Sequence, residues 1–226
     1  LSDGDYLVSG EDGNDWVFGS GEYDYLKGLD GNDYLYSGAG DDTVDGGNGD
    51  DEIVGGSGEG NDYYIGGDGS DTLIYTSAVA GIEVNLRDGY AKSLDISSDA
   101  GIGTDELSQI ENLIASNHSD VIMGGVGNNK IDAKGGDDII HASIGDDTLL
   151  GGDGVDVVIY GYSRSSYNVT WSNEVSAFMV QSELDGIDLL YDVEEIYFSD
   201  VSVQLINSQI NTQPKLFNKS VYLIED

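Results

Sequence analysis

The chain of 226 residues contains 34 glycines, 15 tyrosines, one proline and no cysteine, and its 44 acidic residues against 8 basic ones give a formal net charge of −36. This composition excludes nucleic acid as a partner, because phosphate backbones require clustered Lys and Arg, and it excludes disulfides, thiolate zinc sites and insertion into a membrane. A compact state with this much unneutralised charge repels itself, so we expect a bound cation in the folded protein.

A nine-residue unit recurs from the start of the chain: glycine, glycine, any residue, glycine, a small polar residue, aspartate, any residue, an aliphatic residue, any residue. Residues 46–54 are its clearest copy. The spacing predicts a glycine-rich turn followed by a very short strand whose middle side chain points inward. The aspartates are Asp5, Asp15, Asp24, Asp33, Asp42, Asp51, Asp62 and Asp71, and the inward residues are Leu7, Val17, Leu26, Leu35, Val44, Ile53, Tyr64 and Leu73.

Two units form one coil of a right-handed parallel β-roll, an all-β solenoid in which every second turn stacks on the same edge. With one inward residue in nine, such a core does not offset the ordering entropy of roughly 1 to 2 kcal/mol per residue for the backbone. Carboxylate and carbonyl oxygens in a flexible turn select Ca²⁺ over softer metals, so we expect calcium between stacked turns. One edge carries Asp15, Asp33, Asp51 and Asp71, and the other carries Asp5, Asp24, Asp42 and Asp62.

From Thr76 to Asn117 the nonapeptides stop. Residues 81–86 alternate like a strand, and residues 103–114 indicate a turn followed by a longer strand or a bent pair. The repeats resume with Asp120, Asp138 and Asp156 on one edge and Asn129 and Asp147 on the other, above the inward residues Ile122, Ile131, Ile140, Leu149 and Val158. Asn129 offers an oxygen without a charge, which predicts a weaker site.

The segment after the second array repeats the segment after the first, so the chain is a tandem duplication of an array and a trailer. We interpret the trailers as caps over the exposed end of each roll. Asp105, Glu111, Asp188 and Glu194 occupy matching places in the two trailers. They have the chemistry of a glycosidase carboxylate pair, but their duplication favours a structural cap or an extra calcium ligand. His118 and His141 are paired with no nucleophile, so we expect no catalytic residue and no enzyme.

The nine-residue unit resembles the RTX, or hemolysin-type calcium-binding, nonapeptide. In that family, calcium lies between stacked turns and is held by sixth-position aspartates and by carbonyls of the glycine-rich turn. The resemblance implies several Ca²⁺ ions, bound by the side chains of Asp15, Asp24, Asp33, Asp42, Asp51, Asp62, Asp71, Asp120, Asn129, Asp138, Asp147 and Asp156. It also implies ligation by the backbone carbonyls of Gly13, Gly31, Gly40, Gly47, Gly49, Gly56, Gly67, Gly69, Gly125, Gly127, Gly136, Gly145, Gly152 and Gly154. Glu22 replaces a glycine before Asp24, and the unit of Asp5 is truncated, so both copies depart from the pattern.

Outward aromatic residues gather on the first array. One face holds Trp16, Phe18, Tyr34 and Tyr36, and the opposite face holds Tyr6, Tyr25 and Tyr63. One interpretation is a stacking platform for carbohydrate, since aromatic rings present flat faces to sugar rings. The other is that aromatic residues of neighbouring strands pack on each other or under a trailer. The second interpretation is the favoured one.

We divide the chain into a first RTX β-roll array (1–75), a β-rich trailer (76–117), a second array (118–160), a β-rich C-terminal cap (161–206), and a linker with the start of a cadherin-like or Ig-like repeat (207–226). The predicted function is a calcium-binding structural module that folds on extracellular calcium and forms a rigid segment of a large adhesin. Its partners are neighbouring extracellular domains of the same polypeptide. The resemblance further implies a Gram-negative bacterium and type I secretion. Two alternatives stay open, namely a module that binds carbohydrate or another cell-surface ligand, and the non-catalytic tail of an RTX hydrolase.

Overall fold

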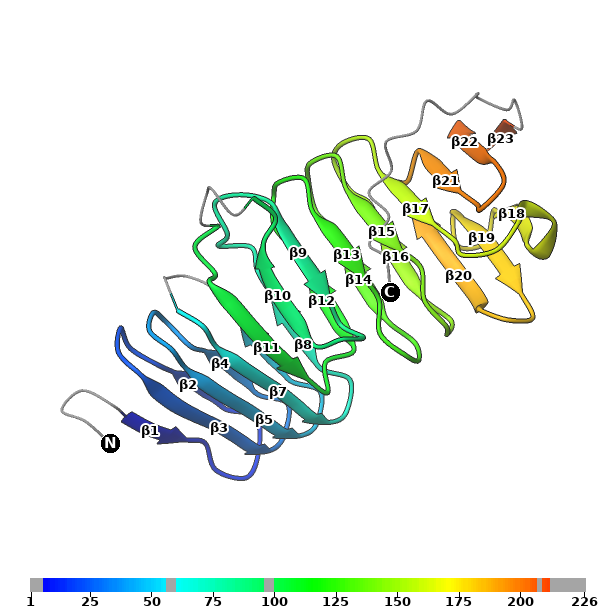
Figure 1. Ribbon diagram of the computed structural model, residues 1–226. Helices are drawn as coiled ribbons and strands as arrows, with labels where there is room; N and C mark the ends of the chain where they lie inside the picture. Colours follow the sequence, from blue (N-terminus) through cyan, green and yellow to red (C-terminus); the bar gives the residue numbers. More distant parts are fainter. Residues whose placement is uncertain (1–5, 56–59, 96–99, 207–208, 212–226) are drawn as a thin grey trace.

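The computed structural model describes residues 6–55, 60–95, 100–206 and 209–211. This part of the chain is all-β apart from one turn of 3-10 helix, η1 (Arg164–Ser166), and its strands form an elongated roll of two sheets (Figure 1). In its order, sheet A comprises β1 (Tyr6–Ser9), β3 (Asp24–Asp30), β5 (Thr43–Asn48), β7 (Tyr63–Asp68), β11 (Thr104–Ser108), β10 (Tyr90–Ser93), β9 (Ile82–Asn85), β13 (Val121–Met123), β15 (Ile139–His141), β17 (Val157–Ile159), β21 (Glu195–Tyr197), β22 (Ser202–Ile206) and β23 (Gln209–Asn211). Sheet B comprises β18 (Asn168–Ser172), β19 (Ala177–Ser182), β20 (Gly186–Tyr191), β16 (Thr148–Leu150), β14 (Lys130–Asp132), β12 (Asn112–Ile114), β8 (Thr72–Ile74), β6 (Glu52–Val54), β4 (Tyr34–Tyr36) and β2 (Trp16–Phe18).

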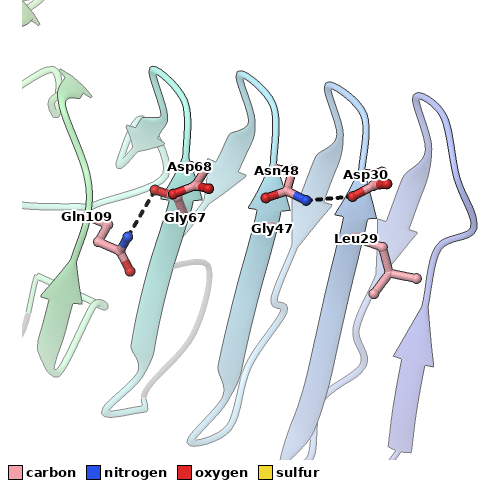
Figure 2. A pocket seen from close by; sticks show the side chains of 7 residues that line it. All are labelled: Leu29, Asp30, Gly47, Asn48, Gly67, Asp68 and Gln109. Carbon is pink, nitrogen blue, oxygen red and sulfur yellow. Dashed lines mark hydrogen bonds between the residues drawn. The ribbon is translucent and has the colours of Figure 1, made fainter.

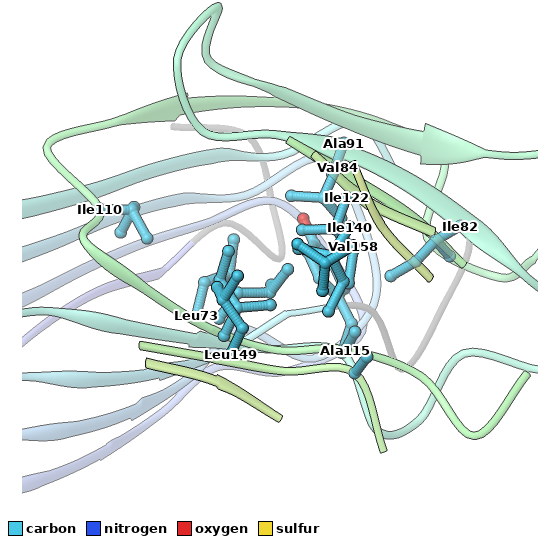
Figure 3. Packing of buried hydrophobic residues seen from close by; sticks show 14 of the residues in the cluster. Leu73, Ile82, Val84, Ala91, Ile110, Ala115, Ile122, Ile140, Leu149 and Val158 are labelled. Atoms are coloured by element: carbon cyan, nitrogen blue, oxygen red, sulfur yellow. The ribbon is translucent and has the colours of Figure 1, made fainter. Parts of the chain in front are cut away.

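Within the arrays, consecutive strands alternate between the two sheets, and each strand pairs in parallel with the strand one coil further on. The middle side chain of each three-residue strand points between the sheets, because successive side chains of a strand face opposite sides. Leu73, Ile122 and Leu149 are fully buried in this core, and Val84 of the first trailer continues it (Figure 3). The predicted β-roll is confirmed, and the expected inward residue is buried in every unit except the first.

The first strand departs from the predicted register. Val8 pairs with Leu26 and packs against the core, whereas Leu7 pairs with Tyr25 and is 59% exposed. The prediction that Leu7 points inward was therefore wrong by one residue. The unit that begins at Asp5 is one residue longer than nine, and a shift of one residue moves every side chain of a strand to the other face.

The capping interpretation expected the first trailer to end the roll, but the roll continues through it. In sheet A, β11 pairs in parallel with β7, β10 pairs antiparallel with β11 and β9, and β9 pairs in parallel with β13 of the second array. In sheet B, β12 lies between β8 and β14 and is parallel to both. Because both edges of these trailer strands are paired, residues 76–117 join the two arrays into one continuous roll.

The second trailer repeats this arrangement with the sheets exchanged. In sheet B, β19 pairs antiparallel with both β18 and β20, and β20 pairs in parallel with β16. In sheet A, β21 pairs in parallel with β17. β22 then pairs antiparallel with β21 and adds Val203 and Leu205 to the core. The predicted linker and further repeat lie outside the described residues, apart from β23. Among the described residues there is no helix with the length and apolar character that a membrane crossing requires.

Candidate calcium-binding turns

The sixth-position residues stack in two rows, one along each edge of the roll. Ladder 1 precedes the strands of sheet B and ladder 2 precedes the strands of sheet A. Within an array and its trailer, the backbone N–H of one member donates to the side-chain oxygen of the next at 2.7 to 3.0 Å. Ladder 1 comprises Asp15, Asp33, Asp51, Asp71, Glu111, Asn129, Asp147 and Asp188, and ladder 2 comprises Asp24, Asp42, Asp62, Asp105, Asp120, Asp138, Asp156 and Glu194.

Seven ladder carboxylates have one buried oxygen that finds no hydrogen-bond donor among the described residues. The side chains concerned belong to residues that are 0% to 3% exposed. Burying a carboxylate oxygen without a partner is costly, whereas a bound cation removes that cost. These open oxygens are Oδ1 of Asp24 and Oδ2 of Asp33, Asp42, Asp51, Asp71, Asp138 and Asp156.

A backbone carbonyl of the next turn lies beside four of these open oxygens, those of Asp33, Asp51, Asp71 and Asp156. A methyl group on Gly28 would overlap both Asp33 Oδ2 and Gly46 O, and the corresponding group on Gly46 would overlap Asp51 Oδ2 and the carbonyl of the next turn. A carboxylate oxygen and a carbonyl oxygen therefore converge on a space that only a residue without Cβ leaves open. The sequence prediction missed these first-position carbonyls, because a Gly-Gly pair does not show which of its two carbonyls faces the carboxylate.

The carbonyls that were predicted as ligands belong mainly to the second and fourth positions of the turns. Here the structure places φ in the left-handed region, for example 115° at Gly47 and 129° at Gly49, which explains the need for glycine. Several of these carbonyls face the same position of the neighbouring turn, as Gly47 O faces Gly67 and Gly49 O faces Gly69. Gly125 is not in the left-handed region, and Gly56 lies outside the described residues. These carbonyls remain predicted ligands.

The outer rim of the ladder 1 turns forms a shallow groove of about 370 Å³. Asn48 Nδ2 donates to Asp30 Oδ1 at 2.6 Å, and Gln109 Nε2 donates to Gly67 O at 3.1 Å (Figure 2). These polar groups bind one another across neighbouring turns, and Leu29 beside them is 41% exposed. The groove is therefore the surface of the stacked turns and not a separate pocket.

Of the remaining ladder members, six aspartates have a protein donor on the second oxygen, and Asn129 is hydrogen-bonded through both polar atoms of its side chain. The donors are the hydroxyls of Tyr64 to Asp62 (2.6 Å), Tyr75 to Asp105 (2.6 Å), Tyr160 to Asp188 (2.8 Å) and Ser143 to Asp147 (2.9 Å), the Ser116 N–H and hydroxyl to Asp120 (both 2.9 Å), and the Glu11 N–H to Asp15 (2.7 Å). Asn129 accepts from the Gly125 N–H at 2.8 Å and donates to Glu111 O at 2.7 Å. Such bonds satisfy a buried polar oxygen without a metal. Five predicted side-chain ligands are in this state: Asp15, Asp62, Asp120, Asn129 and Asp147.

Burial raises the pKa of Asp33, Asp42, Asp51, Asp71, Asp138 and Asp156, because desolvation disfavours the charged form and neighbouring carboxylates add repulsion. The pKa of Asp42 and Asp138 rises to about 7, and that of Asp51, Asp71 and Asp156 to about 6, from an ordinary 3.8. The backbone N–H bonds along the ladder oppose this rise without cancelling it. Without a cation, the turns therefore disfavour their own ionised state.

The donor set fits a hard divalent cation. Carboxylate and carbonyl oxygens surround the open positions, and Ca²⁺ is the ion that takes many such oxygens in flexible geometry. Within the described ranges, no three acidic or histidine side chains gather around one point. Several turns instead pair a carboxylate with a carbonyl of the neighbouring turn, as Asp33 Oδ2 with Gly46 O.

The remaining candidates from the sequence are placed as follows. Trp16 and Phe18 are 74% and 52% exposed, and the ring centroids of Trp16 and Tyr34 lie 4.9 Å apart with planes tilted by 32°. The aromatic residues thus pack on their neighbours, as the favoured interpretation expected, while Trp16 stays open to solvent. His118 is exposed, and His141 lies on the outer face of β15, where burial lowers its pKa.

Two stacked sheets joined by glycine turns, with rows of buried carboxylates along both edges, define a calcium-binding β-roll. A family model, the RTX calcium-binding nonapeptide repeat in four copies, matches residues 9–44, 28–59, 44–73, 114–149 and 132–161, which together cover half of the chain. The chain belongs to this RTX family, whose repeats bind calcium and form a β-roll. A comparison with curated proteins finds no match.

Proposed function

We propose that this chain is a structural module of a secreted or cell-surface protein, which folds when it meets extracellular calcium and then serves as a rigid spacer between neighbouring domains. The observation that carries this proposal is the set of buried carboxylate oxygens without a donor, such as those of Asp51 and Asp138. RTX repeats are typical of secreted proteins, and a large adhesin is the kind of protein in which such a spacer is useful. We assign the chain no catalytic role.

Calcium acts here as the partner that the carboxylates otherwise lack. With a charge of −36, the chain stays expanded when calcium is scarce, because its acidic groups repel one another and its core is thin. Binding is coupled to folding, so the stability of the roll grows with calcium concentration. Extracellular calcium modules have dissociation constants of about 0.1 to 1 mM, which would keep the chain unfolded in a calcium-poor cytosol and folded outside.

The test compares the whole chain in EDTA and in millimolar calcium by circular dichroism and thermal unfolding. We expect strand signal and a cooperative transition only with calcium, and no comparable gain with magnesium, which demands a stricter octahedral geometry. An identical spectrum and melting point in EDTA would overturn the proposal. Matched measurements in sodium chloride of equal ionic strength separate calcium binding from general charge screening.

A second candidate function is the binding of a neutral carbohydrate on the aromatic face of sheet B. The exposure of Trp16, next to Phe18 and Tyr34, favours it. Trp16→Ala combined with Tyr34→Ala should abolish glycan-array binding of the calcium-loaded chain, while Tyr63→Ala on sheet A serves as the control. Array binding that is absent in the parent chain, or unchanged in the double variant, would remove this candidate.

A further inference from the structure

Each trailer makes one turn that is three residues shorter than the nonapeptide turn beside it. Ser108 pairs with Ile65 and Asn112 pairs with Thr72, so residues 109–111 span the distance that residues 66–71 span in the preceding coil. In the second trailer, residues 192–194 replace the six-residue turn 151–156 in the same way. Both short turns end in glutamate, at Glu111 and Glu194, where the nonapeptide turn ends in aspartate.

Although their turns are shorter, the two glutamates occupy the next position of each ladder. Glu111 Oε2 accepts the Asp71 N–H at 2.9 Å, and Glu194 Oε2 accepts the Asp156 N–H at 2.8 Å. Asp71 Oδ1 accepts the Asp51 N–H at 2.9 Å in the same geometry. A glutamate has one methylene more than an aspartate, so its carboxylate reaches the ladder although its backbone follows a shorter path.

An open, buried carboxylate oxygen faces each of these junctions. Oδ2 of Asp71 and of Asp156 has no donor among the described residues, and both residues are 0% exposed. A methyl group on Gly66 would lie 2.6 Å from Asp71 Oδ2 and would overlap Gln109 O. The second junction has the same arrangement around Gly151, where the carbonyl of Asp192 replaces that of Gln109 and Asp156 Oδ2 replaces Asp71 Oδ2. The φ angles of Gln109 and Asp192, 53° and 49°, lie in the left-handed region, which non-glycine residues adopt at a cost.

The opposite edge of each junction is closed by tyrosine. Tyr75 donates its hydroxyl to Asp105 Oδ2 at 2.6 Å, and Tyr160 donates to Asp188 Oδ2 at 2.8 Å. Both tyrosines are almost fully buried. The same trailer therefore places a glutamate beside an aspartate with an open oxygen on one edge, and a hydrogen-bonded carboxylate on the other.

We propose that Glu111 and Glu194, with the carbonyls of Gln109 and Asp192, each complete a calcium site shared between the last nonapeptide of an array and its trailer. Both residues lie outside the segments that match the RTX model. The proposal rests on the calcium-dependent folding proposed above and adds that calcium fastens each trailer to its array on one edge. On the other edge, Tyr75 and Tyr160 take the place of the ion.

The test counts calcium ions per chain by isothermal titration calorimetry on the full chain and on Glu111→Gln, Glu194→Gln and the double variant. Glutamine keeps the length and one oxygen but removes the charge. We expect each single variant to lose one ion, or to weaken one site by on the order of tenfold or more, since ligand charge sets calcium affinity. Glu111→Asp should lose the same ion, because its carboxylate cannot reach from the three-residue turn. Glu106→Gln and Glu183→Gln, on exposed positions of the same trailers, should match the parent.

The tyrosine edge supplies the opposite expectation. Tyr75→Phe and Tyr160→Phe should leave the number of bound ions unchanged and should lower the melting point by a similar amount at every calcium concentration at which the chain folds. Circular dichroism at saturating calcium shows whether each variant is folded, and a Glu111→Gln chain that folds only at higher calcium supports the proposal. The proposal would be overturned if the parent chain binds calcium and the Glu111→Gln, Glu194→Gln double variant binds it with the same stoichiometry and affinity. A parent chain that binds none would instead overturn the proposed function.

Discussion

The two arrays share one fold and differ in what satisfies their ladder carboxylates. In the first array, most ladder aspartates keep a buried oxygen without a donor, as at Asp33, Asp51 and Asp71. In the second array, serine hydroxyls satisfy Asp120 and Asp147, and Asn129 carries no charge. Only Asp138 and Asp156 remain open there, among the described residues. The same backbone can therefore be held by ions in one segment and by hydrogen bonds in another.

This difference teaches that calcium dependence is a property of single turns. A serine four residues before the ladder aspartate provides a hydroxyl that reaches its carboxylate, as Ser116 and Ser143 show in the second array and Ser20 shows at Asp24 in the first. A hydrogen bond within the protein satisfies the carboxylate without a bound ion, although it contributes only about 0.5 to 1.5 kcal/mol of net stability. We therefore expect the first array to need calcium more than the second array does.

Removal of calcium should have the largest effect and should separate the two arrays. As calcium falls, hydrogen exchange of residues 9–55 and 60–73 should accelerate at higher calcium concentration than that of residues 118–160. Each site held at 100-fold excess over its dissociation constant contributes about 2.7 kcal/mol, and the first array holds more open carboxylates. Hydrogen exchange followed by mass spectrometry across a calcium series measures this, and simultaneous loss of protection in both arrays would contradict the comparison.

Protons should partly replace calcium in the metal-free chain. The pKa of Asp42 rises to about 7, and that of Asp51 and Asp71 to about 6, in the folded state. A raised carboxyl pKa means that folding takes up protons, so this contribution is complete below the ordinary value near 3.8 and is lost as the pH rises towards 7. In EDTA we expect the chain to be most folded near pH 4 to 5 and least folded near pH 8. Thermal melts across this range check it, and a metal-free stability that increases from pH 5 to 8 would be the opposite result.

Matched substitutions of one ladder aspartate in each array should sharpen the comparison. Asp51→Asn removes a carboxylate with an open oxygen, and it should lower stability in saturating calcium by about 2 to 3 kcal/mol, the contribution of one site. Asp147→Asn keeps the Asn129 N–H bond and lies beside Ser143, so its calcium dependence should change little. Denaturant unfolding of both variants at several calcium concentrations shows how strongly the free energy of unfolding of each variant depends on calcium. Equal calcium dependence in both variants would show that the hydroxyl does not replace the ion.

The smallest expected effect concerns the cradle beside the open oxygens. Gly46→Ala places a methyl group where Asp51 Oδ2 and Gly66 O converge, and overpacking of this kind costs about 1 to 3 kcal/mol. Gly21→Ala, in the same array, meets nothing within 4 Å and should change stability by less than about 0.5 kcal/mol. The melting points of the two variants in calcium provide the measurement. A Gly46→Ala chain as stable as Gly21→Ala would show that the cradle has room to spare.

Much of the fold followed from the repeat itself. The nine-residue period placed Asp33, Asp51 and Asp71 on one edge, because two short strands and two turns close one coil. It also predicted Tyr64 in an inward slot, where the side chain is fully buried. The register failed at Leu7, since one extra residue in the first unit turns the strand over. Capping failed for the first trailer, because strand pairing across more than thirty residues leaves no mark in the local pattern.

The sequence by itself determined the β-roll, its two edges and the chemistry of its turns, because glycine positions and aspartate spacing are local constraints that repeat. Only the tertiary structure decided which carboxylates stay open. Whether Asp105 is bound to the Tyr75 hydroxyl, or Asp71 keeps an open oxygen beside Glu111, depends on residues that meet across neighbouring coils. Those meetings follow from how the trailers join the arrays, and that connection is a property of the whole roll rather than of any one repeat.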